Sequence, residues 1–214
     1  ATGLEDSGLV REATMPGFYR GQSDCAVLGM AIDDARAHLA NPLEVQRVQE
    51  LLGGGERPLR ADLPTTERAT LAEAKPIAAL IGQTFDAYPT PSHDPSYIAQ
   101  QIEEGTPFRV VREDGQILAC ASADLLRDAR TAELTDCATR PEQRGRGLMQ
   151  AILTDLMGDL RRIGFPTAFT LARARIPGVN LAFERLGFTL RGTMVQSCRI
   201  GDGLEDMNVW SRAL

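Results

Sequence analysis

The chain has 214 residues, which is enough for one large domain or one domain with an extension, and its 43% hydrophobic residues suffice for a core. Its net charge of −6 argues against a general nucleic-acid-binding protein, which would usually carry a basic surface, and fits a site for a cationic substrate. No apolar run is long enough to span a membrane and no signal peptide is visible, so we expect no membrane partner.

The cysteines indicate a reducing compartment. The chain has four cysteines, which are widely spaced and form no CxxC pair. This spacing predicts free thiols in a cytoplasmic protein rather than a disulfide framework. The sequence contains only two histidines, so we expect no zinc site and no other bound metal. The chain begins at Ala1 without a methionine, and we expect it to be processed, trimmed or a fragment of a longer protein.

The first 56 residues are predicted to form a helical extension that precedes a domain over residues 57–214. Asp24–Ala40 has helical character and is ended by an Asn-Pro pair. Residues at helical spacing predict a second short helix over Leu43–Leu52. Three consecutive glycines from Gly53 form a flexible break and mark the expected boundary.

Strands and helices alternate after this boundary. Leu71–Ala87 is predicted to be a helix, and Pro76 is expected to kink it or delay its start. Tyr88–Pro95 contains three prolines in eight positions, which predicts a stiff loop. Asp94 can then cap a helix that begins at Pro95 and ends near Glu104.

The remaining elements follow from alternation and turn residues. Phe108–Glu113 and Gln116–Leu125 are predicted to form a hairpin, because Asp114-Gly115 is a strong two-residue turn signal. Thr131–Thr139 is the next predicted strand. The elements expected after it are a helix over Leu148–Ile163, a strand over Thr167–Ala172, a short helix over Val179–Leu186, and strands over Phe188–Cys198 and Met207–Ser211.

The segment Arg140–Met149 joins a predicted strand to a predicted helix and indicates an anion site. The first turn of a helix has backbone N–H groups without partners, and the helix dipole adds partial positive charge there. Gly145 and Gly147 let a phosphate approach the backbone, and three arginines in the same loop add cationic donors. The pattern lacks the Lys-Ser/Thr of a Walker A loop and the third glycine of a dinucleotide loop. The alternative is a surface turn with scattered arginines.

Three motifs, in chain order, resemble the GNAT N-acetyltransferase family. Ala132–Thr139 looks like the family's central strand, the Arg/Gly loop follows it, and Asn180–Phe188 looks like the family's late helix. The resemblance covers roughly residues 57–214. It implies a mixed α/β (α+β) fold with a mostly antiparallel sheet flanked by helices, here with the N-terminal helical extension. It also implies acetyl-CoA as co-substrate and direct transfer to an amine in a ternary complex.

A narrower resemblance is carried by Tyr88–Tyr97, Leu134–Thr139 and Glu205–Trp210. These segments are similar to β-lysine N6-acetyltransferases, which contribute to compatible-solute synthesis and are generally longer at the N-terminus. Met15–Gly21 looks like their upstream segment. The implied acceptor is the N6-amine of β-lysine. The alternatives are another polyamine, a peptide or protein amine, or a non-catalytic acyl-CoA-binding module. A homodimer is one option for its assembly, which a single sequence does not decide.

The family resemblance also assigns cofactor contacts. Backbone N–H groups of the loop would hold the pyrophosphate, and a backbone N–H near Cys137 would polarise the thioester carbonyl. The Cys137 thiol itself fits a small buried group better than a nucleophile. Asn180 would contact the pantetheine arm, or simply begin a helix. The full set of predicted cofactor-binding residues is Cys137, Ala138, Thr139, Arg144, Gly145, Arg146, Gly147, Leu148, Met149, Asn180 and Phe183.

Acetyl transfer also needs a base, because an ammonium is not a nucleophile. Glu133 and Asp136 are the candidate catalytic carboxylates. Their separation of three places them on opposite faces of a strand unless the strand is bulged. The resemblance favours Glu133 as base and Asp136 as an amine anchor, and the alternative is a pair of ordinary solvated or paired carboxylates. Phe183 stands where many members of the family have a Tyr that acts as general acid. The leaving thiolate would therefore take its proton from Tyr88, Tyr97 or solvent.

Substrate selection is expected from the proline loop and the final strands. Its predicted residues are Tyr88, His93, Asp94, Tyr97 and Asn208. His93 and Asp94 would bind a carboxylate and an amine of the acceptor, and the alternative for His93 is an exposed loop position. The three prolines pre-order this loop, which lowers the entropic cost of holding such contacts.

Overall fold

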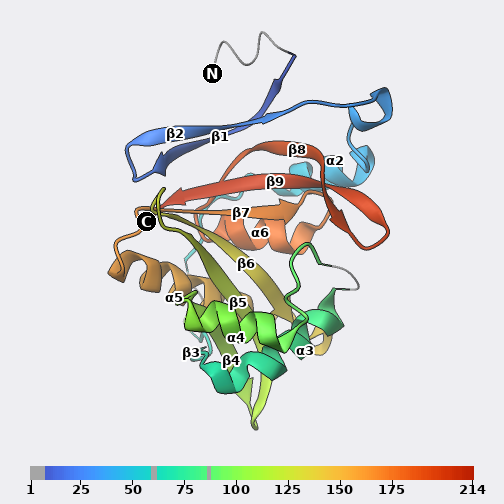
Figure 1. The fold of residues 1–214 in the computed structure, drawn as a ribbon. Coiled ribbons are helices and arrows are strands. Elements are labelled where there is room, and N and C mark those ends of the chain that lie inside the picture. The colour runs from blue at the N-terminus through green and yellow to red at the C-terminus, as the bar shows by residue number, and fades with distance from the viewer. Residues whose placement is uncertain (1–7, 59–61, 86–87) are drawn as a thin grey trace.

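A nine-stranded sheet forms the centre of the protein (Figure 1). The computed structural model describes residues 8–58, 62–85 and 88–214. The strand order is β2-β1-β8-β9-β7-β6-β5-β4-β3, and within the described residues only β6 and β7 pair in parallel. The predicted mixed, mostly antiparallel sheet is therefore confirmed. The strands are β1 (Val10–Tyr19), β2 (Ser23–Gly29), β3 (Glu67–Arg68), β4 (Phe108–Glu113), β5 (Gln116–Leu126), β6 (Thr131–Thr139), β7 (Thr167–Arg173), β8 (Thr189–Ile200) and β9 (Gly203–Ala213).

Helices cover both faces of the sheet. On one face α3 and α4 share a core with β4 and β5, and on the other face α5 and α6 pack against β5, β6, β7 and β9. The buried residues of α5 recur at helical spacing, so one stripe of this helix faces the sheet. The helices are α2 (Pro42–Leu51), α3 (Ala74–Thr84), α4 (Pro95–Glu103), α5 (Leu148–Arg162) and α6 (Pro177–Arg185), with 3₁₀ turns η1 (Asp34–Arg36), η2 (Leu71–Glu73) and η3 (Pro141–Gln143).

The N-terminal segment corrects one prediction. The helix expected over Asp24–Ala40 is wrong, because most of its first part is strand β2, paired antiparallel with β1. Cys25 and Val27 pack at alternate positions against the cluster around Phe18, and this period of two favours a strand. The helix expected over residues 43–52 is confirmed as α2. The boundary after residue 56 stays a prediction, and β1 joins the same sheet through β8.

The predicted segments around α3 and α4 are largely confirmed. A 3₁₀ turn precedes α3, so Pro76 lies in the first turn of a helix that starts late. The predicted last two residues of this helix, 86–87, lie outside the described residues. Asp94 caps α4 by accepting a hydrogen bond from the Ser96 N–H at 2.8 Å. Asp114 and Gly115 have φ of 48° and 76°, as a tight hairpin turn requires.

Strands β6 and β7 separate part of the way along the sheet. They pair from Thr131 to Glu133, opposite residues 167–169, and no further ladder contact follows. Beyond this point the two strands diverge (Figure 1), and residues of both strands line the opening between them. A parallel strand pair that opens in this way offers backbone and side chains of two strands to a ligand.

A bulge in β6 lies beside this opening. Thr135 pairs with Ser122 and Ala138 pairs with Cys120, so Asp136 and Cys137 together oppose a single residue of β5. Asp136 has a φ of 52°, in the left-handed region. The extra residue shifts the alternation of side chains by one position. Asp136 thereby faces the α3/α4 side of the sheet, and the residues after it change sides.

Candidate active site

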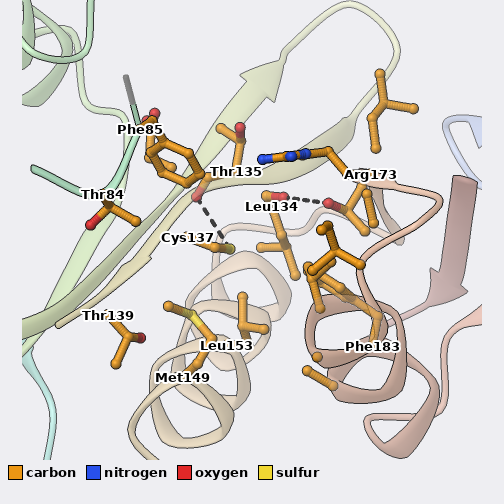
Figure 2. Close-up of a pocket in the computed structure, with 18 of the residues that line it drawn as sticks. Thr84, Phe85, Leu134, Thr135, Cys137, Thr139, Met149, Leu153, Arg173 and Phe183 are labelled. Atoms are coloured by element: carbon orange, nitrogen blue, oxygen red, sulfur yellow. Dashed lines mark hydrogen bonds between the residues drawn. The ribbon is translucent and has the colours of Figure 1, made fainter. Parts of the chain in front are cut away.

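The opening between β6 and β7 widens into a cavity of about 1020 Å³ (Figure 2). Its wall combines the loop after α3, parts of strands β5 to β9, the first turns of α5, and one side of α6. The predicted site residues that it brings together are Tyr88, Glu133, Asp136, Cys137, Thr139, Arg144, Gly145, Gly147, Leu148, Met149 and Phe183. Other predicted residues lie outside this wall, namely His93, Asp94, Tyr97, Ala138, Arg146, Asn180 and Asn208.

The Arg/Gly loop has the geometry of an anion cradle at one end of the cavity. Gly145 and Gly147 have φ of 81° and 80°, a region that glycine adopts without strain. Helix α5 starts at Leu148, and its N-cap Gly147 gives no side-chain hydrogen bond to the first turn. The first-turn N–H groups are therefore left for an anion at the positive end of the helix dipole. This arrangement fits the diphosphate of coenzyme A.

Two predicted cofactor contacts near this loop are turned elsewhere. The Arg146 guanidinium forms an ion pair with Glu113 and also donates to Gln143, so its charge is directed away from the cavity. The Ala138 side chain is fully buried in the α3/α4 core. These contacts do not favour a side-chain role for Arg146 or Ala138, and cofactor binding through their backbone stays a prediction.

Asn180 is part of a buried hydrogen-bond network. Its Nδ2 donates to two backbone carbonyls, of Arg173 at 2.9 Å and Ile176 at 2.8 Å, while its Oδ1 accepts from Asn208 and Trp210 at 2.9 Å each. Both asparagines are fully buried. Their amides are occupied within the protein, which indicates a structural role, and the contacts expected from Asn180 to pantetheine and from Asn208 to substrate stay predictions.

We expect Asn180→Ala to lower the free energy of unfolding by about 2–5 kcal/mol, because it leaves the buried Trp210 and Asn208 donors without an acceptor. Urea denaturation followed by tryptophan fluorescence would measure the loss. A residue whose main role is to bind the cofactor would instead change the affinity for acetyl-CoA and leave the unfolding midpoint in place.

Three carboxylates share the α3/α4 side of the cavity wall. Asp124 of β5 pairs directly opposite Glu133 of β6, and the bulge adds Asp136 to the same face, where it accepts a hydrogen bond from Ser122 at 2.7 Å. Burial raises the pKa of Glu133 to about 7, with further contributions from Asp124 and Asp136. Burial, followed by the charge of Asp136, raises the pKa of Asp124 to about 6. Such a group attracts a cation and holds a base that titrates near neutrality.

We expect Asp124→Asn to raise the melting temperature, and to do so increasingly as the pH rises from 4 to 7. A carboxyl whose folded pKa lies above its unfolded value binds more protons when folded, so its contribution to stability falls as pH rises through that interval. The asparagine has no charge to bury, and a gain of about 2–4 °C corresponds to roughly 1 kcal/mol in a protein of this size. Thermal melts of both proteins across this pH range would test it, and a constant difference at every pH would contradict it.

Tyr88 reaches the same group from the proline loop. Its hydroxyl accepts a hydrogen bond from the Asp136 N–H at 3.2 Å and lies 3.2 Å from the Thr135 hydroxyl. Burial, followed by the charge of Asp136, raises the pKa of Tyr88, so the phenol keeps its proton at neutral pH. Tyr88 is therefore placed to donate a proton inside the cavity, where Phe183 has no hydroxyl to offer.

Cys137 lies in the cavity wall next to Met149 and Leu153 (Figure 2). Burial, with the nearby charges of Asp136 and Glu133, raises the pKa of this thiol, so it stays protonated. A protonated thiol is a poor nucleophile, which agrees with a packing role for its side chain.

Beyond Thr90 the proline loop no longer lines the cavity. His93 and Asp94 are exposed, and the Asp94 carboxylate caps α4. The ring of Tyr97 packs against the α3/α4 core. Burial, followed by the charges of Asp124 and Asp136, raises the pKa of Tyr97, so this tyrosine lies close enough to feel the carboxylates. Direct acceptor contacts by His93, Asp94 and Tyr97 stay predictions.

Sequence reasoning missed part of the wall. Asp124, Arg173, Met194 and Cys198 line the cavity without having been singled out. A signal existed for Asp124, because it is the one charged residue in the mostly apolar second strand of a predicted hairpin. In the part of the chain that the structure describes, no group of His, Cys, Asp and Glu is arranged to hold a metal ion, and no helix is long and apolar enough to cross a membrane.

A splayed parallel strand pair, a helix N-terminus with a glycine-rich loop, and a buried carboxylate group define an acetyltransferase-type site. The chain belongs to the acetyltransferase (GNAT) family, whose model matches residues 76–188. It is similar to solved structures of this fold, including a ribosomal-protein-alanine N-acetyltransferase from Brucella melitensis (TM-score 0.62, 17% identity, covering 70% of this chain and 99% of that one). A phosphinothricin acetyltransferase from Sinorhizobium meliloti in complex with acetyl-CoA also matches (TM-score 0.61, 23% identity, 70% and 88% covered).

Curated relatives give closer sequence similarity. The chain is 41% identical over 150 residues to a β-lysine N(6)-acetyltransferase from Methanosarcina mazei, which covers 70% of this chain and 55% of the relative. It is 29% identical over 206 residues to the N-acetyltransferase YodP from Bacillus subtilis, covering 95% of this chain and 74% of the relative. The chain thus spans only about half the length of the Methanosarcina mazei relative.

Proposed function

We propose that this protein transfers the acetyl group of acetyl-CoA to a primary amine of a small cationic metabolite, with the N6-amine of β-lysine as first choice. The observation that carries the proposal is the carboxylate group of Asp124, Glu133 and Asp136, which lies in one cavity with the Arg/Gly loop. The loop suits the diphosphate of the donor, and the carboxylates suit an ammonium group. The name of the Methanosarcina mazei relative supports β-lysine as the acceptor.

The residues of the cavity supply the proton transfers that this reaction requires. Bound acetyl-CoA supplies a thioester whose carbonyl carbon accepts the amine nitrogen, so that a C–N bond replaces the C–S bond. The Glu133 carboxylate takes a proton from the ammonium, because its raised pKa makes it a base near neutral pH. The Tyr88 hydroxyl, which holds its proton, is the candidate donor to the departing thiolate. The Asp136 carboxylate holds the cationic acceptor.

A screen of amines with detection of released thiol would test this proposal. The panel should contain β-lysine, lysine, simple diamines and a lysine-containing peptide, and acetyl-CoA binding should be measured separately by calorimetry. Turnover with small diamines or diamino acids, but not with the peptide, supports the proposal. Turnover with the peptide alone would replace it with protein acetylation. Binding without any turnover would indicate an acyl-CoA-binding module.

A further inference from the structure

The carboxylate side of the cavity also contains one arginine. Arg173 is the last residue of β7 and lines the cavity. Phe169 of this strand pairs with Glu133, and side chains alternate along a strand, so residues 169, 171 and 173 face the same side as Glu133. In Figure 2 the Arg173 side chain extends over the cavity toward Thr135 of β6. The positive charge therefore lies on the acceptor side of the sheet and away from the diphosphate loop.

The Arg173 guanidinium is anchored but keeps hydrogen-bonding capacity. Its Nη2 donates to Glu205 Oε1 at 3.0 Å, and the side chains of Arg173 and Glu205 are 26% and 5% exposed. The Nε of Arg173 is buried and has no hydrogen-bond partner among the described residues. Arg175 holds the same carboxylate with Nε–Oε2 and Nη2–Oε1 contacts of 2.8 and 2.7 Å, so Glu205 does not depend on Arg173 alone.

A buried carboxylate in the wall carries the opposite charge. Asp136 is only 4% exposed, burial raises the pKa of its carboxyl, and hydrogen bonds from Ser122 and Ser92 lower it. Leaving the Arg173 Nε unpaired is costly, so an acceptor that gives this guanidinium an anionic partner gains affinity. A cationic group of the same acceptor is attracted by Asp136.

We propose that Arg173 binds the carboxylate of the acceptor, so that the site selects a diamino acid over a diamine of the same length. This inference rests on the proposed function and adds to it the residue that reads the carboxylate. The Glu133 carboxyl is hydrogen-bonded by the Leu171 backbone, and Arg173 follows two residues later, about 7 Å further along the strand. One small molecule can therefore place its amine at Glu133 and its carboxylate at Arg173.

Three acceptors that differ only at the carboxylate would test the assignment: 3,6-diaminohexanoate, its carboxamide, and 1,4-diaminopentane. For the wild-type protein we expect kcat/KM to be roughly 10- to 100-fold higher for the acid than for the other two, the range of a lost charge-assisted hydrogen bond. In Arg173→Gln this ratio should fall close to one, with turnover of the carboxamide and the diamine largely retained. The change should appear in KM more than in kcat, because the carboxylate is remote from the reacting carbon.

Arg175→Gln is the matched control, because Arg175 shares Glu205 but is not part of the cavity wall. It should keep the wild-type preference for the acid. An unchanged preference in Arg173→Gln, or an equal loss with all three acceptors, would overturn the assignment. If Arg173→Gln does not fold, Arg173→Lys keeps a charge beside Glu205 but not the planar fork, and the preference should then drop by at least about threefold; a wild-type preference in this variant would also overturn the assignment.

The outcomes separate the two proposals. A wild-type protein that releases no thiol with any amine contradicts the proposed function. A wild-type protein that acetylates all three acceptors equally well keeps the proposed function and contradicts only the role of Arg173.

Discussion

Glu133→Gln is expected to lower kcat by about 10²- to 10⁴-fold, the usual contribution of a positioned general base. The pKa of Glu133 is raised to about 7 by burial and by the neighbouring carboxylates, so the proton-accepting form becomes populated as pH rises through neutrality. Wild-type turnover should therefore increase with pH up to about 8. The glutamine variant should lack this rise, because an amide does not titrate. Steady-state kinetics from pH 5.5 to 9 would show both effects.

The affinity for acetyl-CoA serves as the control for this variant. Glu133 lies on the α3/α4 side of the sheet and the diphosphate loop begins α5 on the other side, so calorimetry should give similar dissociation constants for the variant and the wild type. Glu133→Asp should recover part of the turnover and restore a pH dependence, since it keeps a carboxylate. If Glu133→Gln turns over as fast as the wild type at every pH, Glu133 is not the base.

Gly147→Asp is expected to weaken acetyl-CoA binding by about 100-fold or more. Gly147 is the N-cap of α5, and a carboxylate there would repel a diphosphate held by the first helical turn. A like-charge interaction of a few kcal/mol at about 4 Å, for a partly screened pair, gives this order of magnitude. Isothermal titration calorimetry with acetyl-CoA and with free coenzyme A would measure it.

Gly147→Asn separates charge from shape. Asparagine and aspartate have nearly the same size, and both tolerate the φ of 80° at this position better than other residues do. The asparagine variant should lose much less affinity than the aspartate variant, and the difference between them should shrink as salt is added. Equal losses in the two variants would mean that backbone strain, and not repulsion of the diphosphate, limits binding.

Features specified by a few neighbouring residues could be predicted from the sequence. The Asp114-Gly115 turn, the Asp94 cap and the glycine loop before α5 each depend on local backbone preferences, and the structure places all three where the sequence predicts them. The late start of α3 follows from Pro76 in the same way. The Arg20-Gly21 pair, with φ of 57° and 72°, was an equally local signal for the β1–β2 hairpin, and sequence reasoning overlooked it.

Features that depend on contacts between distant segments could not be predicted. The network of Asn180 exists because β9 places Asn208 and Trp210 beside α6, and no local pattern near residue 180 reveals those neighbours. The pairing of Arg146 with Glu113 requires the β4–β5 hairpin to lie next to the loop. Asp124 lies beside Glu133 only because of the register in which β5 pairs with β6. The sequence alone does not give this register, so it could not place Asp124 in the carboxylate group.

The extra residue of the β6 bulge keeps the Asp136 carboxylate on the α3/α4 side of the sheet. Without the extra residue, position 136 would turn toward α5 and α6, where the surrounding core is apolar and an acid would be buried without a partner. Loss of the codon for one of the two residues that oppose Ala121 would therefore remove the acid from the site, because the single residue left would face α5, while Ala138 and Thr139 would keep their partners in β5 and their facing. A single deletion would thus change the chemistry of the acceptor side without shifting the rest of the strand.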